Sequence, residues 1–111
     1  MKMRMQTFLL AMVFAALASP CCAGEQSGVI AAIIKRSSDG LVYFYLSGAA
    51  VGKPSCATQS YWMIKDENSN TGKQQLAMLL MARATGQTIS VSGSNACTRW
   101  GDGEDLDAIA L

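Results

Sequence analysis

The sequence predicts a mostly β fold with one α-helix, and three patterns carry that prediction. Two β-rich runs flank Asp39-Gly40, a pair typical of a two-residue hairpin turn because both positions need positive φ. Residues 71–85 have the apolar spacing and the end signals of a helix. Residues 88–93 alternate apolar and polar side chains, as half-buried strands do. We therefore expect short strands, interrupted once by the helix.

The hairpin predicts one core-facing set of side chains. In the two-residue register Lys35 faces Phe44, and Tyr43 and Tyr45 point away from the core. The core-facing set is then Val29, Ala31, Ile33, Val42, Phe44 and Leu46. A third strand is expected over residues 60–66. A last strand is expected over residues 106–111, with no clear choice of its buried face.

The predicted order is strand, strand, strand, helix, strand, strand. Consecutive strands joined by short connections favour antiparallel pairing. Five strands with one helix between the third and fourth are typical of an OB-type Greek-key barrel, which is the fold we predict. A generic α+β open sheet, with the helix on one face, is the alternative.

The first 23 residues have the layout of a cleavable secretory signal. A basic start precedes an uncharged run over residues 7–18, and small residues follow up to Ala23. The uncharged run is shorter than the ~20 residues that span a membrane, so we expect cleavage after Ala23 and no stable membrane anchor. The mature chain is then a single domain of residues 24–111, located in the periplasm or secreted.

The composition of the mature chain disfavours two classes of function. It contains seven basic and eight acidic side chains, a net charge of −1, so no basic field exists for nucleic acid. It contains no histidine, the commonest general base, so we expect no enzyme, no cofactor and no metal site. The acidic segment 102–107 lacks the oxygen spacing of an EF-hand loop and is expected to be a solvated loop and strand edge.

Cys56 and Cys97 are the two cysteines that remain after the signal. An even pair in an exported protein predicts a disulfide, because the compartment is oxidising. The bond closes a loop of about 40 residues, which the chain-entropy estimate values at roughly 4 kcal/mol.

The helix is apolar on two sides. Thr71 is the expected N-cap, and Gly86 stands where a terminating glycine belongs. One stripe, expected to plug the barrel, consists of Leu76, Leu79, Leu80 and Ala84. The second stripe consists of Met78, Met81 and Ala82. It predicts either the interface of a homo-oligomer or a surface covered by a connection or by the last strand.

Binding is the remaining class of function. A sugar is held by hydroxyl hydrogen bonds and an aromatic face, and exposed tyrosines and serines supply both groups. We therefore take Ser27, Tyr43 and Tyr45 as candidate ligand-binding residues.

Short motifs also carry a resemblance to a known family. The sequence has SGVI at 27–30, YFYL at 43–46, a proline and a cysteine at 54–56, and ATGQTISV at 84–91. Together these resemble the B subunits of subtilase-cytotoxin and pertussis-like toxins, and small exported bacterial proteins of unassigned function. The resemblance implies an OB-type barrel, a ring of five subunits with central helices, and recognition of sialylated glycans. It assigns Ser27 to the sugar site.

The sequence therefore predicts an exported, non-enzymatic binding module, with a glycan-binding, B-subunit-like oligomer as its sharper form. The alternative is a small monomeric periplasmic protein that binds a protein partner or serves an envelope role.

Overall fold

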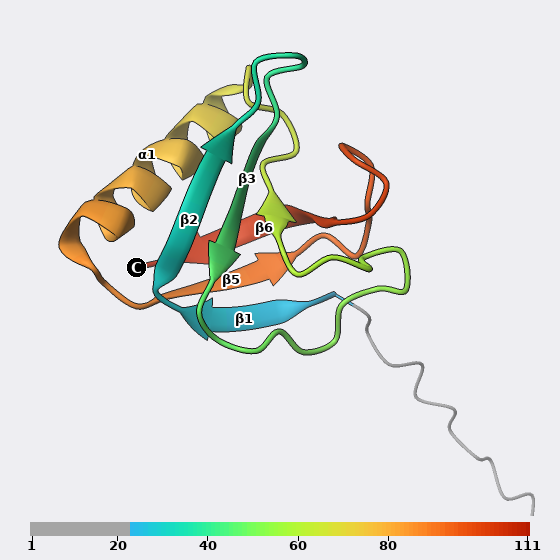
Figure 1. Ribbon diagram of the computed structural model, residues 1–111, viewed down its shortest axis with the longest axis horizontal. Helices are drawn as coiled ribbons and strands as arrows, with labels where there is room; N and C mark the ends of the chain where they lie inside the picture. The colour runs from blue at the N-terminus through green and yellow to red at the C-terminus, as the bar shows by residue number, and fades with distance from the viewer. Residues whose placement is uncertain (1–22) are drawn as a thin grey trace, which may run out of the picture.

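The computed structural model describes residues 23–111 (Figure 1). The predicted signal sequence lies outside these residues, apart from Ala23. The strands are β1 Glu25–Gly28, β2 Ile30–Lys35, β3 Val42–Leu46, β4 Trp62–Met63, β5 Ile89–Gly93 and β6 Glu104–Ala110. The helix α1 Asn70–Thr85 lies between β4 and β5 in the chain. A mostly β fold with one helix is thus confirmed, with six strands instead of five.

The six strands form one mixed sheet in the order β1-β5-β6-β4-β3-β2. Neighbouring strands are antiparallel, except that β4 and β6 are parallel. The predicted five-stranded OB-type barrel is wrong, because this sheet is not closed and has β1 and β2 as its two end strands.

The first predicted strand is in fact two strands joined at Val29. Before this residue the chain pairs with β5, and after it the chain pairs with β3. The Val29 carbonyl accepts a hydrogen bond from the Ser47 backbone N–H at 2.9 Å, and its own N–H donates to Ser47 Oγ at 3.1 Å. A single continuous run therefore connects the two ends of a curled sheet, and Figure 1 shows β1 crossing below β2 and β3.

The β2–β3 turn is longer than predicted. Lys35 pairs with Val42 instead of Phe44, so residues 37–40 lie in the turn and the predicted register is wrong by two residues. Gly40 has positive φ, at 78°, whereas Asp39 is not among the positive-φ residues, so the two-residue turn that needs both is excluded.

The core lies between the curled sheet and α1. Its largest members are Trp62 and Phe44, both fully buried. The predicted burial of Val42, Phe44 and Leu46 is confirmed. A register shift between Ile30 and Ala32 turns Ile30 into the core, so the expected inward positions of Val29 and Ala31 are wrong and both are exposed. Such a bulge reverses which side chains face inward.

The helix begins two residues earlier than predicted. Ser69, not Thr71, is the N-cap, and its Oγ accepts a hydrogen bond from the Gly72 N–H at 2.9 Å. The predicted end is confirmed, because Gly86 adopts φ 67° and its N–H donates to the Ala82 carbonyl. Within residues 23–111 we find no helix with the length and apolar character needed to cross a bilayer.

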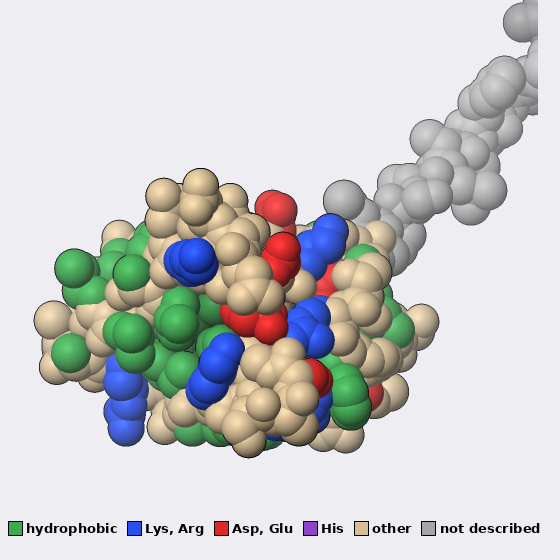
Figure 2. All heavy atoms as spheres, turned by 90° about the horizontal axis from the view of Figure 1, so that it is seen from above, with side chains coloured by type: hydrophobic (Ala, Val, Ile, Leu, Met, Phe, Trp, Pro, Cys, Tyr) green, Lys and Arg blue, Asp and Glu red, His purple; other side chains and the backbone are tan. Residues whose placement is uncertain are grey.

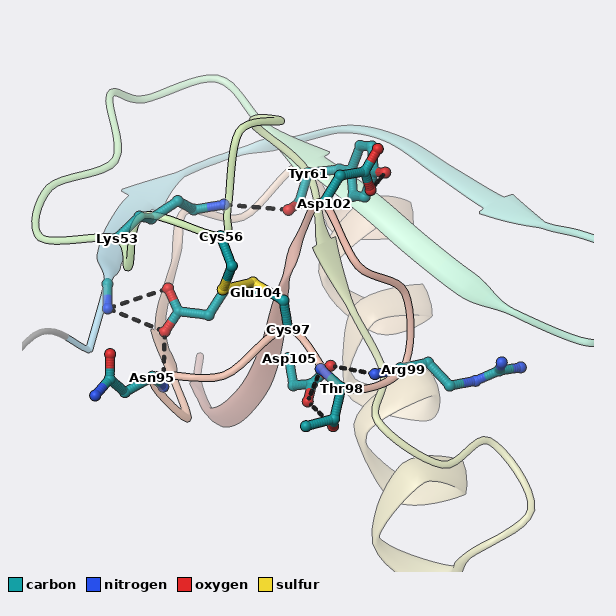
Figure 3. Close-up of a disulfide and its surroundings, with 11 residues drawn as sticks. Lys53, Cys56, Tyr61, Asn95, Cys97, Thr98, Arg99, Asp102, Glu104 and Asp105 are labelled. Carbon is teal, nitrogen blue, oxygen red and sulfur yellow. Dashed lines mark hydrogen bonds between the residues drawn. A yellow bond between two sulfur atoms is a disulfide. The ribbon is translucent and has the colours of Figure 1, made fainter.

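The predicted disulfide is confirmed. Cys56 and Cys97 are bonded, with their Cα atoms 6.2 Å apart (Figure 3). The bond ties the long β3–β4 connection to the β5–β6 connection. A disulfide of this kind is typical of oxidising compartments outside the cytoplasm.

Candidate functional site

Three tyrosines lie side by side on the outer side of β3 and β4, and we call them the tyrosine face: Tyr43, Tyr45 and Tyr61. Because Val42, Phe44 and Leu46 point inward, the alternation along β3 turns its two tyrosines outward. The ring centroid of Tyr61 lies 5.1 Å from that of Tyr43 and 5.8 Å from that of Tyr45. All three side chains are half-buried. The predicted ligand-binding pair therefore belongs to a larger aromatic surface.

Tyr61 is fixed in place from two sides. Its hydroxyl donates a hydrogen bond to Asp102 Oδ1. Gly103 packs against its ring, and a Cβ added there would lie 2.5 Å from Tyr61 Cε2. Burial and this hydrogen bond raise the pKa of Tyr61 above its ordinary value, so the phenol stays protonated at physiological pH. The adjacent Trp62 is the core member of the pair, and its indole N–H donates to Gln26 Oε1 at 2.7 Å.

A cation and an indole extend this surface. The Arg36 guanidinium lies 4.1 Å from the centroid of the Trp100 ring, and Trp100 is exposed. Arg36 also donates to both carboxylate oxygens of Asp39, which holds the pKa of that carboxyl far below its usual range. The pKa of Arg36 is raised, mainly by Asp39 and to a smaller extent by Tyr43 and Tyr61. Arg36 is thus within electrostatic reach of the tyrosine face.

Opposite charges gather near the tip of the β2–β3 hairpin. The Arg99 side chain donates to Glu67 Oε1 at 2.9 Å and to the Asp39 carbonyl at 2.9 Å. Figure 2, which looks down on this end of the molecule, shows the acidic and basic side chains interleaved near the middle. The positive and negative charges of this cluster are paired with each other, so it does not present a field of one sign. Its bonds connect the β2–β3 turn to the β5–β6 connection.

Ser27 lies in a different place from the tyrosine face. Its hydroxyl is 2.8 Å from that of Ser90 across the β1–β5 pair. The two line a groove of about 320 Å³ whose other lining residues are Glu25, Gln26, Val91, Ser92, Ala108, Ile109 and Ala110. Within residues 23–111, Ser27 makes no hydrogen bond to a tyrosine of the face and shares no cavity with one. The structure thus separates the candidate ligand-binding residues into two places.

Sequence reasoning missed a larger cleft at the start of α1. It has a volume of about 600 Å³ and is lined by Lys65, Asp66, Ser69, Thr71, Gly72, Gln75, Thr98, Arg99, Leu106 and Asp107. These residues come from three separate segments of the chain, so no local pattern reveals the cleft. Its charged groups are of both signs, which gives it no evident preference for a charged ligand.

Two acidic residues predicted to be solvated are fully buried: Glu104 and Asp105. The Glu104 carboxylate accepts from the Asn95 N–H at 3.0 Å and from the Gly24 N–H, at 3.1 Å to each oxygen (Figure 3). Asp105 accepts from the backbone N–H groups of Thr98 and Arg99, at 3.0 and 3.1 Å, and from the Thr98 hydroxyl. The expectation of a solvated edge is wrong here, because inward-facing amides stabilise both charges.

The inner side of α1 differs from the predicted stripe. Leu79 and Ala82 are buried and Leu76 is half-buried against the core, whereas Leu80 and Ala84 are exposed. The helix is therefore turned by about one residue position, ~100°, from the predicted orientation.

The outer side of α1 is apolar as well. We call it the outer stripe, and it consists of Ala77, Leu80, Met81 and Ala84, all exposed. Leu80 and Met81 are 55% and 62% exposed, which is unusual for large apolar side chains next to each other. Of the predicted interface residues only Met81 is in this stripe, because Met78 is half-buried and Ala82 belongs to the core. Figure 2 shows hydrophobic side chains gathered on the side where α1 lies.

Comparisons with protein-family models, with curated proteins and with solved structures found no match. The resemblance to toxin B subunits accordingly rests on its short sequence motifs, and the closed barrel that it implied is not the observed fold. Three surfaces offer binding groups: the tyrosine face, the outer stripe, and the groove that Ser27 and Ser90 line, which we call the serine groove. Among residues 23–111 no group of three potential metal-ligating side chains is present.

Proposed function

We propose that this protein is an exported, non-enzymatic binding module that holds a glycan on the tyrosine face. The observation that carries the proposal is the cluster of three half-exposed rings, with centroids 5.1 to 6.2 Å apart, on one side of the sheet. Tyrosine is stiff, with an apolar ring and a polar hydroxyl, and therefore loses little conformational entropy on binding. A sugar matches this surface, because its apolar C–H face packs on a ring while its hydroxyls take hydrogen bonds.

The edges of the tyrosine face supply the polar groups that a glycan needs. Tyr61 is held by Asp102, so its ring position is fixed before a ligand arrives. Arg36 lies against the ring of the exposed Trp100, and Tyr43 and Tyr61 contribute to raising the pKa of Arg36. Arg36 donates to Asp39 through Nε and Nη2, so its Nη1 is the nitrogen that would meet the carboxylate of a sugar, the class that the toxin resemblance implies for this chain.

A catalytic role has little support in the same surface. The chain contains no histidine, and the buried carboxylates Glu104 and Asp105 are occupied by backbone donors. The half-buried acid that contacts the tyrosine face, Asp102, accepts a hydrogen bond from the Tyr61 hydroxyl. The face therefore offers binding groups without an evident pair of an acid and a base.

A glycan array that contains neutral and sialylated oligosaccharides tests the proposal. We expect binding by the oxidised protein, and a loss of about fivefold or more in affinity for Tyr45→Ala, since one aromatic contact is worth ~1 kcal/mol or more. Tyr45→Phe keeps the ring and is the matched control. A variant Ser27→Ala separates the serine groove from the face. Binding that survives Tyr45→Ala and disappears in Ser27→Ala would place the ligand in the groove and contradict the proposal.

The second candidate is self-association through the outer stripe. The adjacent exposure of Leu80 and Met81 favours it. A stable interface buries ~800 Å² per partner, more than four helical side chains supply, so neighbouring surface has to contribute. Sedimentation velocity distinguishes an oligomer from a monomer. We expect the wild-type protein and Lys73→Glu, a surface control, to associate, and Met81→Glu to stay monomeric. A wild-type protein that stays monomeric at high concentration would exclude this candidate and leave the monomeric alternative.

A further inference from the structure

The backbone nitrogen of Gly24 lies against a buried carboxylate. Glu104 is fully buried, and the Gly24 nitrogen is 3.1 Å from each of its two carboxylate oxygens. Gly24 is itself buried, and its carbonyl accepts from the Gly93 N–H at 2.9 Å. An amide nitrogen has a single hydrogen to share between these two oxygens.

The space around Gly24 accepts no side chain. A Cβ at this position would lie 2.5 Å from Glu104 Oε1, 2.6 Å from Lys53 Cγ and 3.0 Å from Trp62 Cη2. A Cβ at Gly93 would overlap the other carboxylate oxygen of Glu104. Glycine at positions 24 and 93 therefore allows the Gly24 nitrogen to approach the Glu104 carboxylate, because a side chain at either position would collide with that carboxylate.

The buried carboxylate has no ion-pair partner among the salt bridges of the described residues. Lys53 is within electrostatic reach, but its amino group donates to the Tyr61 carbonyl at 3.1 Å and lies 4.0 Å from the centroid of the Trp62 ring. Burial lowers the pKa of Lys53 and the Glu104 charge acts against that change. A carboxylate removed from water is strongly destabilising unless it is paired or fully hydrogen-bonded.

We propose that removal of the signal sequence between Ala23 and Gly24 makes the new α-ammonium of Gly24 the buried counter-ion of Glu104. Two independent observations select the same peptide bond. The small-residue pattern of the signal ends at Ala23, and the nitrogen of the following residue is the one that faces the carboxylate.

The chemistry is hydrolysis of one peptide bond by a signal peptidase. Water supplies hydroxyl to the Ala23 carbonyl carbon and hydrogen to the Gly24 nitrogen, and the C–N bond breaks. Ala23 leaves as a carboxylate with the signal. The freed amine takes a proton from solvent, because its ordinary pKa is ~7.7 to 8.0. The nitrogen then has three donors and a positive charge, so each oxygen of Glu104 can accept its own bond.

The proposal ties the stability of the domain to processing. A chain with any residue ahead of Gly24 keeps an uncharged amide at this position, so Glu104 retains its hydrogen bonds from Gly24 and Asn95 but has no counter-ion. Loss of one partner of a buried ion pair is strongly destabilising. We therefore expect the processed chain to be the most stable form, and uncleaved or wrongly cleaved chains to unfold more readily.

The test begins with the full-length chain exported by a bacterial host. Intact mass of the purified protein is expected to show a chain that starts at Gly24. The comparison is a variant with one extra alanine ahead of Gly24, purified in the same way and checked by mass to retain it. We expect the extra alanine to raise the unfolding equilibrium constant by roughly a hundredfold. In a Glu104→Gln background the extra alanine should change the unfolding equilibrium constant much less. In a Glu25→Gln background, where the changed acid is exposed, the effect of the extra alanine should stay the same.

A second readout applies if Glu104→Gln does not fold. The stability difference between the chain that starts at Gly24 and the extended chain should be full below the ordinary pKa of an amino terminus, and should disappear as pH rises through its folded-state pKa. The charged groups around this nitrogen are Glu104 on β6, Lys53 on the β3–β4 connection and Glu25 next in the chain. A mature chain that begins elsewhere, or equal stability of the two forms at neutral pH, would overturn the proposal.

Discussion

Removal of the Cys56–Cys97 disulfide provides the sharpest test of how this small domain is held together. The bond joins residues 41 apart in the sequence and connects two long loops that flank β4 and β6. In the chain-entropy estimate a loop of this length is worth about 4 kcal/mol, because the bond restricts the unfolded chain. The double variant Cys56→Ser, Cys97→Ser should lose that amount of unfolding free energy.

The size of the domain converts this free energy into a temperature. An unfolding entropy of about 2.1 cal/mol/K per residue gives about 0.19 kcal/mol/K for a domain of this length. A loss of about 4 kcal/mol then lowers the midpoint of thermal unfolding by about 20 °C. A loss of this size is a large fraction of the ~5–15 kcal/mol that a domain usually has.

Urea unfolding followed by tryptophan fluorescence measures the change. Trp62 is fully buried, so its emission reports the loss of the core. The double variant should unfold at lower urea with an equal or larger slope, because its unfolded chain is more expanded. The Cys56→Ser single variant leaves a free thiol and needs a reducing control. A double variant within about 1 kcal/mol of the oxidised protein would refute the assignment of stability to the restricted unfolded chain.

Three further predictions follow from single contacts. Leu79→Ala should destabilise the domain by about 3 kcal/mol, whereas Leu80→Ala should stay within about 0.5 kcal/mol in the same urea assay, because the first residue is in the core and the second is exposed. Ser69→Ala should lose about 1 kcal/mol and Thr71→Ala nearly nothing, and the reverse order would contradict the observed cap. The Asp39 carboxyl, whose pKa is lowered mainly by its hydrogen bond from arginine, should stabilise the fold above its unfolded pKa and lose that effect as pH falls through its folded value. An NMR titration of the Asp39 carboxyl that shows an ordinary pKa would contradict this.

Local patterns predicted those features that neighbouring residues determine. The alternation along β3 placed Phe44 inward and Tyr45 outward, and both positions are observed. Gly86 ends the helix as predicted, because its left-handed conformation is a local requirement. The disulfide was predicted from the expected compartment and the cysteine count.

Features that depend on distant partners were not predictable in the same way. No turn residue marks Val29 as a boundary, so a single β run looked like one strand although its halves pair with β5 and β3. Closure into a barrel was inferred from the order of elements, and that order does not fix which strands become neighbours. Several residues before Thr71 can cap a helix, so the local sequence left the choice of Ser69 open.

In the candidate site, too, local sequence predicted some positions and contacts between distant residues determined the others. The outward position of Tyr43 and Tyr45 was predicted because β3 is regular, whereas the packing of Tyr61 against them depends on the folded arrangement of β3 and β4. The acidic run at residues 102–107 looked solvated because no sequence pattern marks the loop amides of Asn95, Thr98 and Arg99 as donors to its carboxylates. Glu104 also accepts from the nitrogen of Gly24, 80 residues away.

An NMR titration of the ¹⁵N-labelled, oxidised protein with sialyllactose tests the central claim most directly, since it reports where a glycan binds as well as whether it binds. We expect chemical-shift changes to be concentrated at Tyr43, Tyr45 and Tyr61 and at the indole of Trp100, with smaller changes for lactose. No changes at millimolar sugar, or changes confined to Ser27 and Ser90 in the groove between β1 and β5, would contradict the assignment of the tyrosine face as the binding surface.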